Sequence, residues 1–147
     1  MTYLEKLSAI RQQMKADGVA AYIIPSADPH ISEYLPDHYK CIKFTTGFKG
    51  SVSTVVITPN FAGLWADFRY FEQATDELKG SGFELVKLKV QHAPEYIAWL
   101  GETLAKGSTI AFDEKLVSVV LGELLHQQLA FKAIHFTNKD YLNPIWK

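Results

Sequence analysis

The chain has 147 residues, of which 48% are hydrophobic and 21% are charged, and its formal net charge is -1. This length suits one domain, and the near-neutral balance lacks the basic excess of a nucleic-acid-binding surface. No apolar run approaches the roughly 18 residues that span a membrane, and the amphipathic start is not typical of a secretory signal. The single cysteine, Cys41, excludes an internal disulfide and fits a reducing compartment. We therefore expect a cytoplasmic protein with neither a nucleic-acid nor a membrane partner.

The first elements along the chain are a helix and a buried strand. Thr2 and Glu5 have the spacing of a capping box, and apolar residues recur at helical spacing through residues 4–14. The pair at 17–18, Asp-Gly, is a stop signal for this helix. The apolar run at 19–24 predicts a buried strand, which Pro25 ends.

A long polar segment separates this strand from the next pair. Residues 25–51 are rich in turn-forming residues and predict a loop, whereas 52–58 and 62–67 predict strands. The connection between these two strands is too short for a helical crossover. They must therefore be antiparallel, so the sheet is mixed.

Helices and strands alternate through the rest of the chain. The expected elements are a helix capped by Asp67, a strand at 83–88, a helix at 93–105, a strand at 108–113, a helix at 118–130 and a strand at 132–136. This alternation predicts an α/β fold with helices on the faces of the sheet. The chain stops abruptly after Trp146. We therefore expect residues 1–147 to be one domain of a longer protein.

Few residue patterns suggest chemistry. Asp28, His30, Ser32 and Glu33 could hold a metal ion, but we favour a capped turn in which polar side chains bond backbone amides. Cys41 lies near lysines that could lower its pKa, but we favour a structural, half-buried thiol. The segment "TGFKGS" lacks the full spacing of a phosphate-binding loop, and its glycines more simply permit positive φ angles.

Arg69 is the most informative candidate. It is expected in the first turn of the helix after residues 62–67, where the helix dipole is unfavourable for a cation. The aromatic neighbours are Trp65, Phe68, Tyr70 and Phe71. Two interpretations stay open. Arg69 either grips a carboxylate or carbonyl group of a ligand, or pairs with Gln73 or the capping Asp67 on a solvated face.

Three ordered motifs carry a family resemblance. They are "PSADPHISEY" at 25–34, "FTTGFKGSVSTVVIT" at 44–58 and "LWADFRYFEQA" at 64–74. Together they resemble the creatinase/prolidase N-terminal domain of Xaa-Pro aminopeptidases (aminopeptidase P), of the cytosolic, three-domain type. The resemblance extends over nearly the whole chain, to "NPIW" at 143–146.

The resemblance implies a fold and a function. The fold is a mixed sheet with helices on both faces, related to ribonuclease H in topology. In the family, two metal ions, usually manganese, are held in a C-terminal "pita-bread" domain, which removes the residue preceding proline from a peptide. None of those metal-binding motifs occurs in residues 1–147. The chain is therefore expected to be inactive alone, to wall the substrate cleft beside its own C-terminal catalytic domain, and to support homodimer contacts.

The resemblance also points to Arg69 as a substrate-binding residue. It aligns with the arginine of the family's D-G-R-Y-F motif, where Phe68 replaces the glycine. A second departure is Lys49, where relatives often carry an acidic residue. Lys49 is expected to change the charge of its loop rather than the fold.

Two rival functions remain. The whole protein could be an Xaa-Pro dipeptidase (prolidase) or a creatinase-like amidinohydrolase. Alternatively, the chain could be a free-standing binding or dimerisation module. The sequence leaves open the choice between aminopeptidase and dipeptidase, and the preferred first residue of the substrate.

Overall fold

The computed structural model describes residues 1–25, 35–50, 53–90 and 93–146. The group proposed at Asp28, His30, Ser32 and Glu33 lies outside these residues. The strands are β1 (Ala21–Ile24), β2 (Thr54–Ile57), β3 (Ala62–Ala66), β4 (Glu84–Lys87), β5 (Thr109–Phe112) and β6 (His135–Asn138). The helices are α1 (Tyr3–Asp17), α2 (Leu35–Thr46), α3 (Phe71–Glu77), α4 (Glu95–Thr103) and α5 (Val119–Leu129).

The described strands form one sheet in the order β4-β3-β2-β1-β5-β6. Strand β2 is antiparallel to both β1 and β3, and the other neighbouring pairs are parallel. All strands except β2 therefore finish at the same end of the sheet, which we call the carboxyl end. This order agrees with the expected ribonuclease H-like topology, and it confirms the mixed sheet and the antiparallel pairing of residues 52–67.

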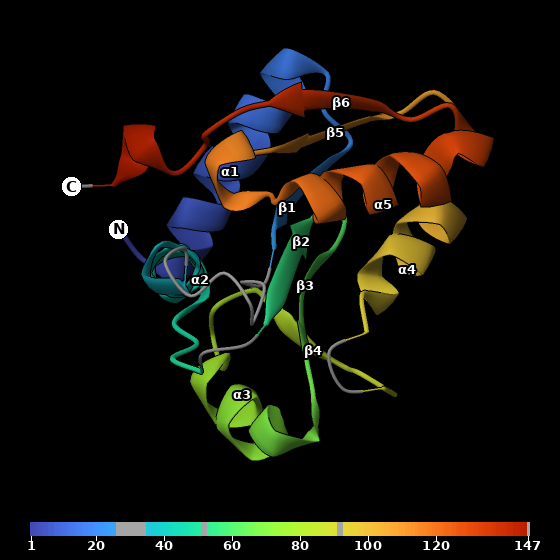
Figure 1. Ribbon diagram of the computed structural model, residues 1–147. Helices are drawn as coiled ribbons and strands as arrows, with labels where there is room; N and C mark the ends of the chain where they lie inside the picture. Colours follow the sequence, from blue (N-terminus) through green and yellow to red (C-terminus); the bar gives the residue numbers. More distant parts are fainter. Residues whose placement is uncertain (26–34, 51–52, 91–92, 147) are drawn as a thin grey trace.

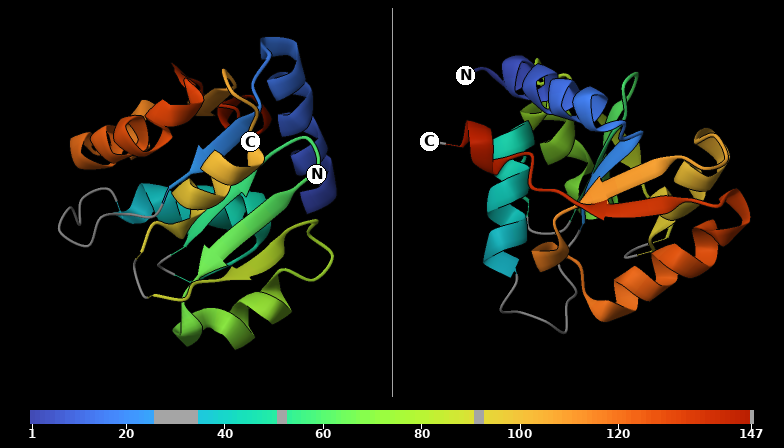
Figure 2. Two further views of the ribbon diagram at one scale, coloured as in Figure 1. Left: turned by 90° about the vertical axis from the view of Figure 1, so that its right-hand side faces the viewer. Right: turned by 90° about the horizontal axis from the view of Figure 1, so that it is seen from above.

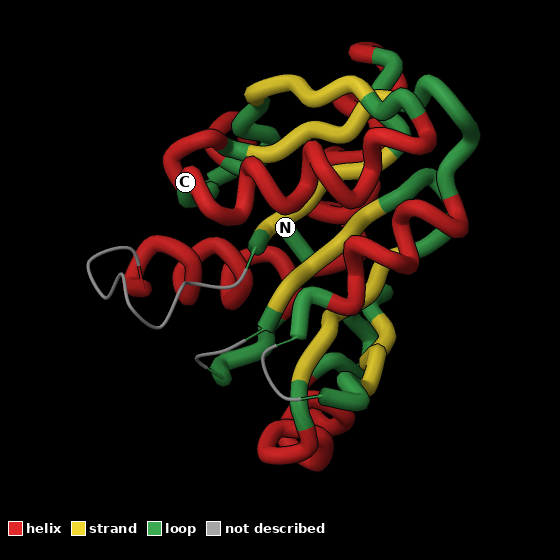
Figure 3. Tube along the Cα trace, turned by 45° about the vertical axis from the view of Figure 1, so that its right-hand side comes forward, coloured by secondary structure: helices red, strands yellow, loops and turns green. Residues whose placement is uncertain are grey.

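Helices cover both faces of the sheet, as expected. Helices α1, α2 and α3 pack on one face, and α4 and α5 pack on the other (Figure 1, Figure 2). In Figure 3 the helices accordingly lie in front of and behind the strands. Strand β1 shows why: Tyr22 and Ile24 belong to the first core, and Ala21 and Ile23 to the second. Alternate side chains of a strand point to opposite faces, so a wholly apolar strand requires cover on both sides.

The start of α1 follows its local signals. The Thr2 hydroxyl accepts from the Glu5 amide at 3.1 Å, and the Glu5 carboxylate accepts from the Thr2 amide at 2.9 Å. This is the expected capping box. Gly18 ends the helix with φ 68°, a left-handed conformation that glycine adopts without steric cost.

Helix α2 corrects the sequence analysis, which predicted a loop across residues 25–51. Its second residue is Pro36, and proline is tolerated in the first turn of a helix. Near its end, the hydroxyls of Thr45 and Thr46 donate to the carbonyls of Cys41 and Ile42, each at 2.8 Å. Ile42 is buried against the sheet. The helix is thus stabilised by packing that the turn-rich composition does not reveal.

The last strand also begins later than predicted. Residues Ala130–Lys132 form a 3-10 turn, and Ala133 has φ 51°. A left-handed residue interrupts an extended strand, so β6 starts at His135 rather than at Lys132. Both chain ends lie on the same side of the molecule, beside α2 (Figure 1, Figure 2). There the ring of Trp146 stacks on that of Phe44 with centroids 4.3 Å apart.

Candidate functional site

Asp67 and Arg69 lie at the carboxyl end of the sheet, directly after β3. The chain there forms a 3-10 turn, Phe68–Tyr70, before α3 begins at Phe71. Arg69 is therefore in this turn, not in the first turn of α3 as expected. Strand ends of this kind commonly carry ligand sites in α/β sheets, because the loops that follow them converge.

A forked ion pair joins the two side chains. The Arg69 Nε and Nη2 atoms donate to Asp67 Oδ1 and Oδ2 at 3.0 and 2.8 Å. The Arg69 amide also donates to Oδ1 at 3.0 Å, so Asp67 caps the turn. The side chain of Asp67 is 2% exposed and that of Arg69 is 42% exposed. A nearly buried carboxylate is thus satisfied by a guanidinium that still reaches solvent.

This pair resolves the unfavourable position of the cation. The hydrogen bonds that Arg69 donates to the Asp67 carboxylate raise the pKa of the guanidinium above its ordinary value. The alternative partner, Gln73, instead donates to Glu77 at 3.1 Å. One of the two proposed contacts on the protein is therefore formed. It leaves Nη1 of Arg69 without a hydrogen bond to any described residue, so the guanidinium can donate to a further oxygen.

The aromatic neighbours of Arg69 go to different places. The guanidinium carbon lies 5.4 Å from the centroid of the Tyr70 ring. Phe68 is 68% exposed beside it. Trp65 is buried in the core beneath α4, with its ring 5.4 Å from that of Trp99. Tyr70 is thus the aromatic residue placed against Arg69, and Trp65 belongs to the opposite face of the sheet.

The loop at 47–50 supports the turn from the α2 side. The Phe48 ring meets Tyr70 edge-on at 5.7 Å, and a Cβ on Gly50 would lie 2.2 Å from Phe48. Gly50 is therefore required by close packing, whereas only Gly47, at φ 84°, shows the positive φ expected of both glycines. The Lys49 amide donates to the Glu77 carboxylate at 2.8 Å and thereby ties the loop to α3.

A buried hydroxyl lies at the same end of the sheet. Ser53, just before β2, is 3% exposed, and its Oγ has no hydrogen-bond partner among the residues that the structure describes. An unsatisfied buried hydroxyl generally costs about 1–3 kcal/mol, so such a group is uncommon in a folded protein. No residue pattern in the sequence marks Ser53 as a candidate.

The other candidate chemistry is sparse in the described ranges. Among those residues no group of three or more His, Cys, Asp and Glu side chains could hold a metal ion. The described residues therefore offer no ligand set for the manganese ions that the resemblance places in a C-terminal domain. Cys41, in α2, is half-buried against the first core, as a structural thiol would be. None of the helices seen here is long and apolar enough to cross a membrane.

Comparison with known proteins identifies the family. The model of the creatinase/prolidase N-terminal domain matches residues 6–142. The chain belongs to this family. It is 36% identical to Aminopeptidase P2 of Arabidopsis thaliana over 97% of the chain but 21% of that protein. The chain thus spans about a fifth of the length of this curated relative.

Solved structures agree with the fold. The crystal structure of X-prolyl aminopeptidase from Caenorhabditis elegans superposes with a TM-score of 0.84 at 32% identity, over 99% of this chain and 26% of that one. It is described as a cytosolic enzyme with a di-nuclear active site. An aminopeptidase P structure from Streptococcus thermophilus matches with a TM-score of 0.74 at 19% identity, over 99% of this chain and 98% of that one. The latter similarity supports the fold alone.

Arg11 is a further charged residue that the sequence analysis overlooked. It lies on the buried side of α1, between Leu7 and Met14 in helical spacing, and its Nε donates to the Thr58 carbonyl at 3.0 Å. The sequence does contain a signal for Arg11, because a cation stands there within the apolar stripe of an amphipathic helix.

Proposed function

We propose that this chain is the non-catalytic N-terminal domain of a metal-dependent Xaa-Pro aminopeptidase. Its similarity to Aminopeptidase P2 over 97% of the chain carries the proposal. The catalytic domain and its pair of metal ions, of which manganese is our choice, then belong to the remainder of the whole protein. That protein would be a cytoplasmic homodimer that removes the residue preceding proline from peptides. The cytosolic description of the Caenorhabditis elegans enzyme supports the location.

Arg69 is the residue through which this domain would touch the substrate. Its guanidinium is held by Asp67, half exposed, at the carboxyl end of the sheet. Because Nε and Nη2 bind the two Asp67 oxygens, Nη1 is not used in this pair. A backbone carbonyl or the terminal carboxylate of the peptide, beyond the bond that is cleaved, would accept from it. Holding that end of the peptide would orient the bond for attack in the catalytic domain.

The kinetic test uses the whole protein. Arg69→Ala should lower kcat/KM for an Xaa-Pro-Xaa peptide by about ten- to a hundredfold, because a hydrogen bond donated by a charged group is lost. Arg69→Lys should recover part of this loss, since lysine keeps the charge without the planar fork. The exposed Lys106, in the turn before β5 at the opposite end of the sheet, provides the control Lys106→Ala.

A purely structural Arg69 would behave differently. Because it also braces Asp67, its removal should lower the melting temperature under either interpretation. The decisive readout is a peptide with a free carboxylate compared with its C-terminal amide. If Arg69 binds the terminal carboxylate, the wild type prefers the free acid and Arg69→Ala loses that preference. If Arg69 binds a carbonyl, Arg69→Ala lowers kcat/KM equally for both substrates. An Arg69→Ala protein with wild-type kcat/KM for both would refute the substrate contact.

The rival functions are separated by two simple observations. Reading the gene beyond Lys147 distinguishes an enzyme from a free-standing module, because an enzyme requires a downstream set of Asp, His and Glu metal ligands. Assays on Xaa-Pro-Xaa and Xaa-Pro then separate an aminopeptidase from a dipeptidase. Hydrolysis of Xaa-Pro alone, or of creatine alone, would overturn the aminopeptidase assignment.

A further inference from the structure

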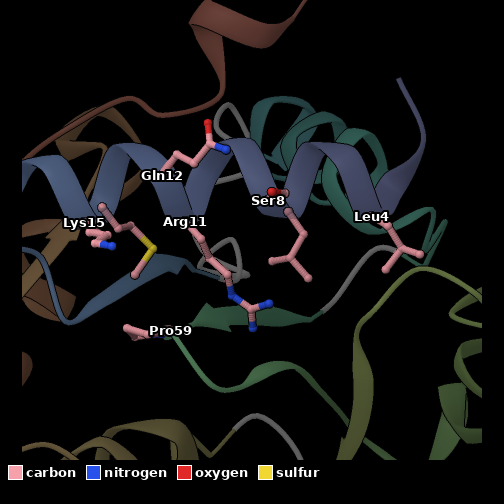
Figure 4. Close-up of a pocket in the computed structure, with 8 residues that line it drawn as sticks. Leu4, Ser8, Arg11, Gln12, Lys15 and Pro59 are labelled. Atoms are coloured by element: carbon pink, nitrogen blue, oxygen red, sulfur yellow. The ribbon is translucent and has the colours of Figure 1, made fainter.

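A groove runs between α1 and the turn that joins β2 to β3. Its volume is about 620 Å³, within the range of roughly 300–1,000 Å³ typical of small-molecule sites. The residues that line it are Leu4, Leu7, Ser8, Arg11, Gln12, Met14, Lys15 and Pro59. Figure 4 shows Arg11 reaching across the groove from α1 toward the strands, with Leu4 at one end and Lys15 and Pro59 at the other.

Arg11 occupies this groove without a carboxylate. Its Nε donates to the Thr58 carbonyl at 3.0 Å, which fixes the plane of the guanidinium. It forms no ion pair with any residue that the structure describes, and its terminal nitrogens have no hydrogen bond to those residues. Burial lowers the pKa of the Arg11 guanidinium, because the surroundings disfavour its charge. A partly desolvated cation of this kind is stabilised when an anion binds to it.

The remaining lining defines the chemistry of a matching ligand. Lys15 adds a second cation one turn further along α1, and the lining contains no Asp or Glu. Leu4, which is 56% exposed, provides an apolar surface beside the charges, whereas Leu7 and Met14 line the groove with side chains that are 3% and 1% exposed. A purely ionic ligand would leave this surface in water, and a purely apolar ligand would leave Arg11 unpaired. The complementary ligand therefore carries both a negative group and an apolar tail.

We propose that this groove binds a small amphipathic carboxylate. Its carboxylate accepts from the terminal guanidinium nitrogens of Arg11, with Lys15 nearby, and its aliphatic tail lies along Leu4. The site is at the opposite end of the sheet from Arg69, because Thr58 follows the end of the antiparallel strand β2. It does not depend on the aminopeptidase proposal, and a failure of either leaves the other intact.

The test measures binding of octanoate to the 147-residue chain by calorimetry and by NMR of the methyl groups. Saturable binding should shift the methyl signals of Leu4, Leu7 and Met14. Acetate, which lacks the tail, and octylammonium, which has the opposite charge, should bind at least about tenfold more weakly. Octyl phosphate tests whether the site prefers a phosphate, and tighter binding of it than of octanoate would overturn the carboxylate assignment.

Variants then locate the site. Arg11→Gln should weaken octanoate binding by about tenfold or more, and Lys15→Gln by a few-fold, because Lys15 is exposed. Leu4→Gln should weaken octanoate but not the short-tailed butyrate. Lys106→Gln, the matched surface cation, should have no effect. Circular dichroism checks that each variant is folded, and Lys15 and Leu4 still test the site if Arg11→Gln is not. Absence of saturable octanoate binding would refute the proposal. So would Leu4→Gln and Lys15→Gln variants that bind octanoate as tightly as the wild type.

Discussion

Arg69 and Arg11 lie at opposite ends of the same sheet and differ in what surrounds their charge. Arg69 forms a fork with a carboxylate two positions earlier in the chain. Arg11 donates to a carbonyl 47 positions away. The first is neutralised by its local sequence, whereas the second is held by the packing of α1 on the β2–β3 turn. A neutral partner such as a carbonyl fixes the position of a cation but does not balance its charge. Arg11 can therefore still bind an anion.

The two pKa shifts express this difference. The hydrogen bond to Asp67 raises the pKa of Arg69, and burial lowers the pKa of Arg11. Both guanidinium groups remain charged at neutral pH, because arginine titrates far above that range. The opposite directions therefore report the surroundings rather than a change of charge state. Three experiments test the comparison.

The largest effect is expected at Asp67, whose carboxylate is nearly buried and caps the 3-10 turn. Asp67→Ala removes the cap and the bonds to Arg69, and should lower the free energy of unfolding by about 1–3 kcal/mol. Asp76, whose side chain is 81% exposed and whose contact with Lys79 is 3.7 Å, provides the control Asp76→Ala. Urea denaturation measures both. Equal losses would mean that the burial of Asp67 is unimportant.

A smaller effect should separate the arginines directly. Arg69→Gln leaves the Asp67 carboxylate without its fork, so the midpoint of denaturation should fall. Arg11→Gln removes a partly desolvated charge, and the glutamine amide can still donate to the Thr58 carbonyl. Its midpoint should therefore change little. The comparison uses the midpoints of the two denaturation curves, which report stability when the dependence on denaturant concentration has the same slope in both variants. If Arg11→Gln proved the more damaging, its main role would be to brace the turn.

The smallest effect concerns the start of α1, the helix that supplies most of the groove. The hydrogen bond from the Thr2 amide is the main cause that lowers the pKa of Glu5. The capping box should therefore contribute stability above the unfolded pKa of Glu5, and lose it as pH falls through the lowered folded pKa. Glu5→Ala should be slightly less stable than wild type at neutral pH and equal to it in acid. Glu123→Ala, an exposed glutamate in α5, is the control. A difference that persists in acid would contradict the assignment.

Helix α2 and strand β6 show where the sequence was insufficient. The prolines and glycines of residues 25–51 predict a loop, yet α2 forms because Ile42 and its neighbours are buried against the sheet. The apolar run at 132–136 predicts a strand, yet Ala133 adopts a left-handed conformation and delays it. In α2 contacts with distant segments overrode a local preference, and before β6 a left-handed turn did so.

The sequence by itself determined the features that depend on neighbours in the chain. These include the capping box of Thr2 and Glu5, the helix stop at Gly18, the antiparallel pairing of β2 and β3, and the placement of Arg69 after a strand. The family motifs identified the domain. The tertiary structure alone decided that Asp67 is buried beneath its arginine. Within the described part of the chain, it also left Ser53 without a hydrogen-bond partner and Arg11 in a groove without a carboxylate. Burial depends on which surfaces meet when the sheet and helices pack, and no local pattern specifies that meeting.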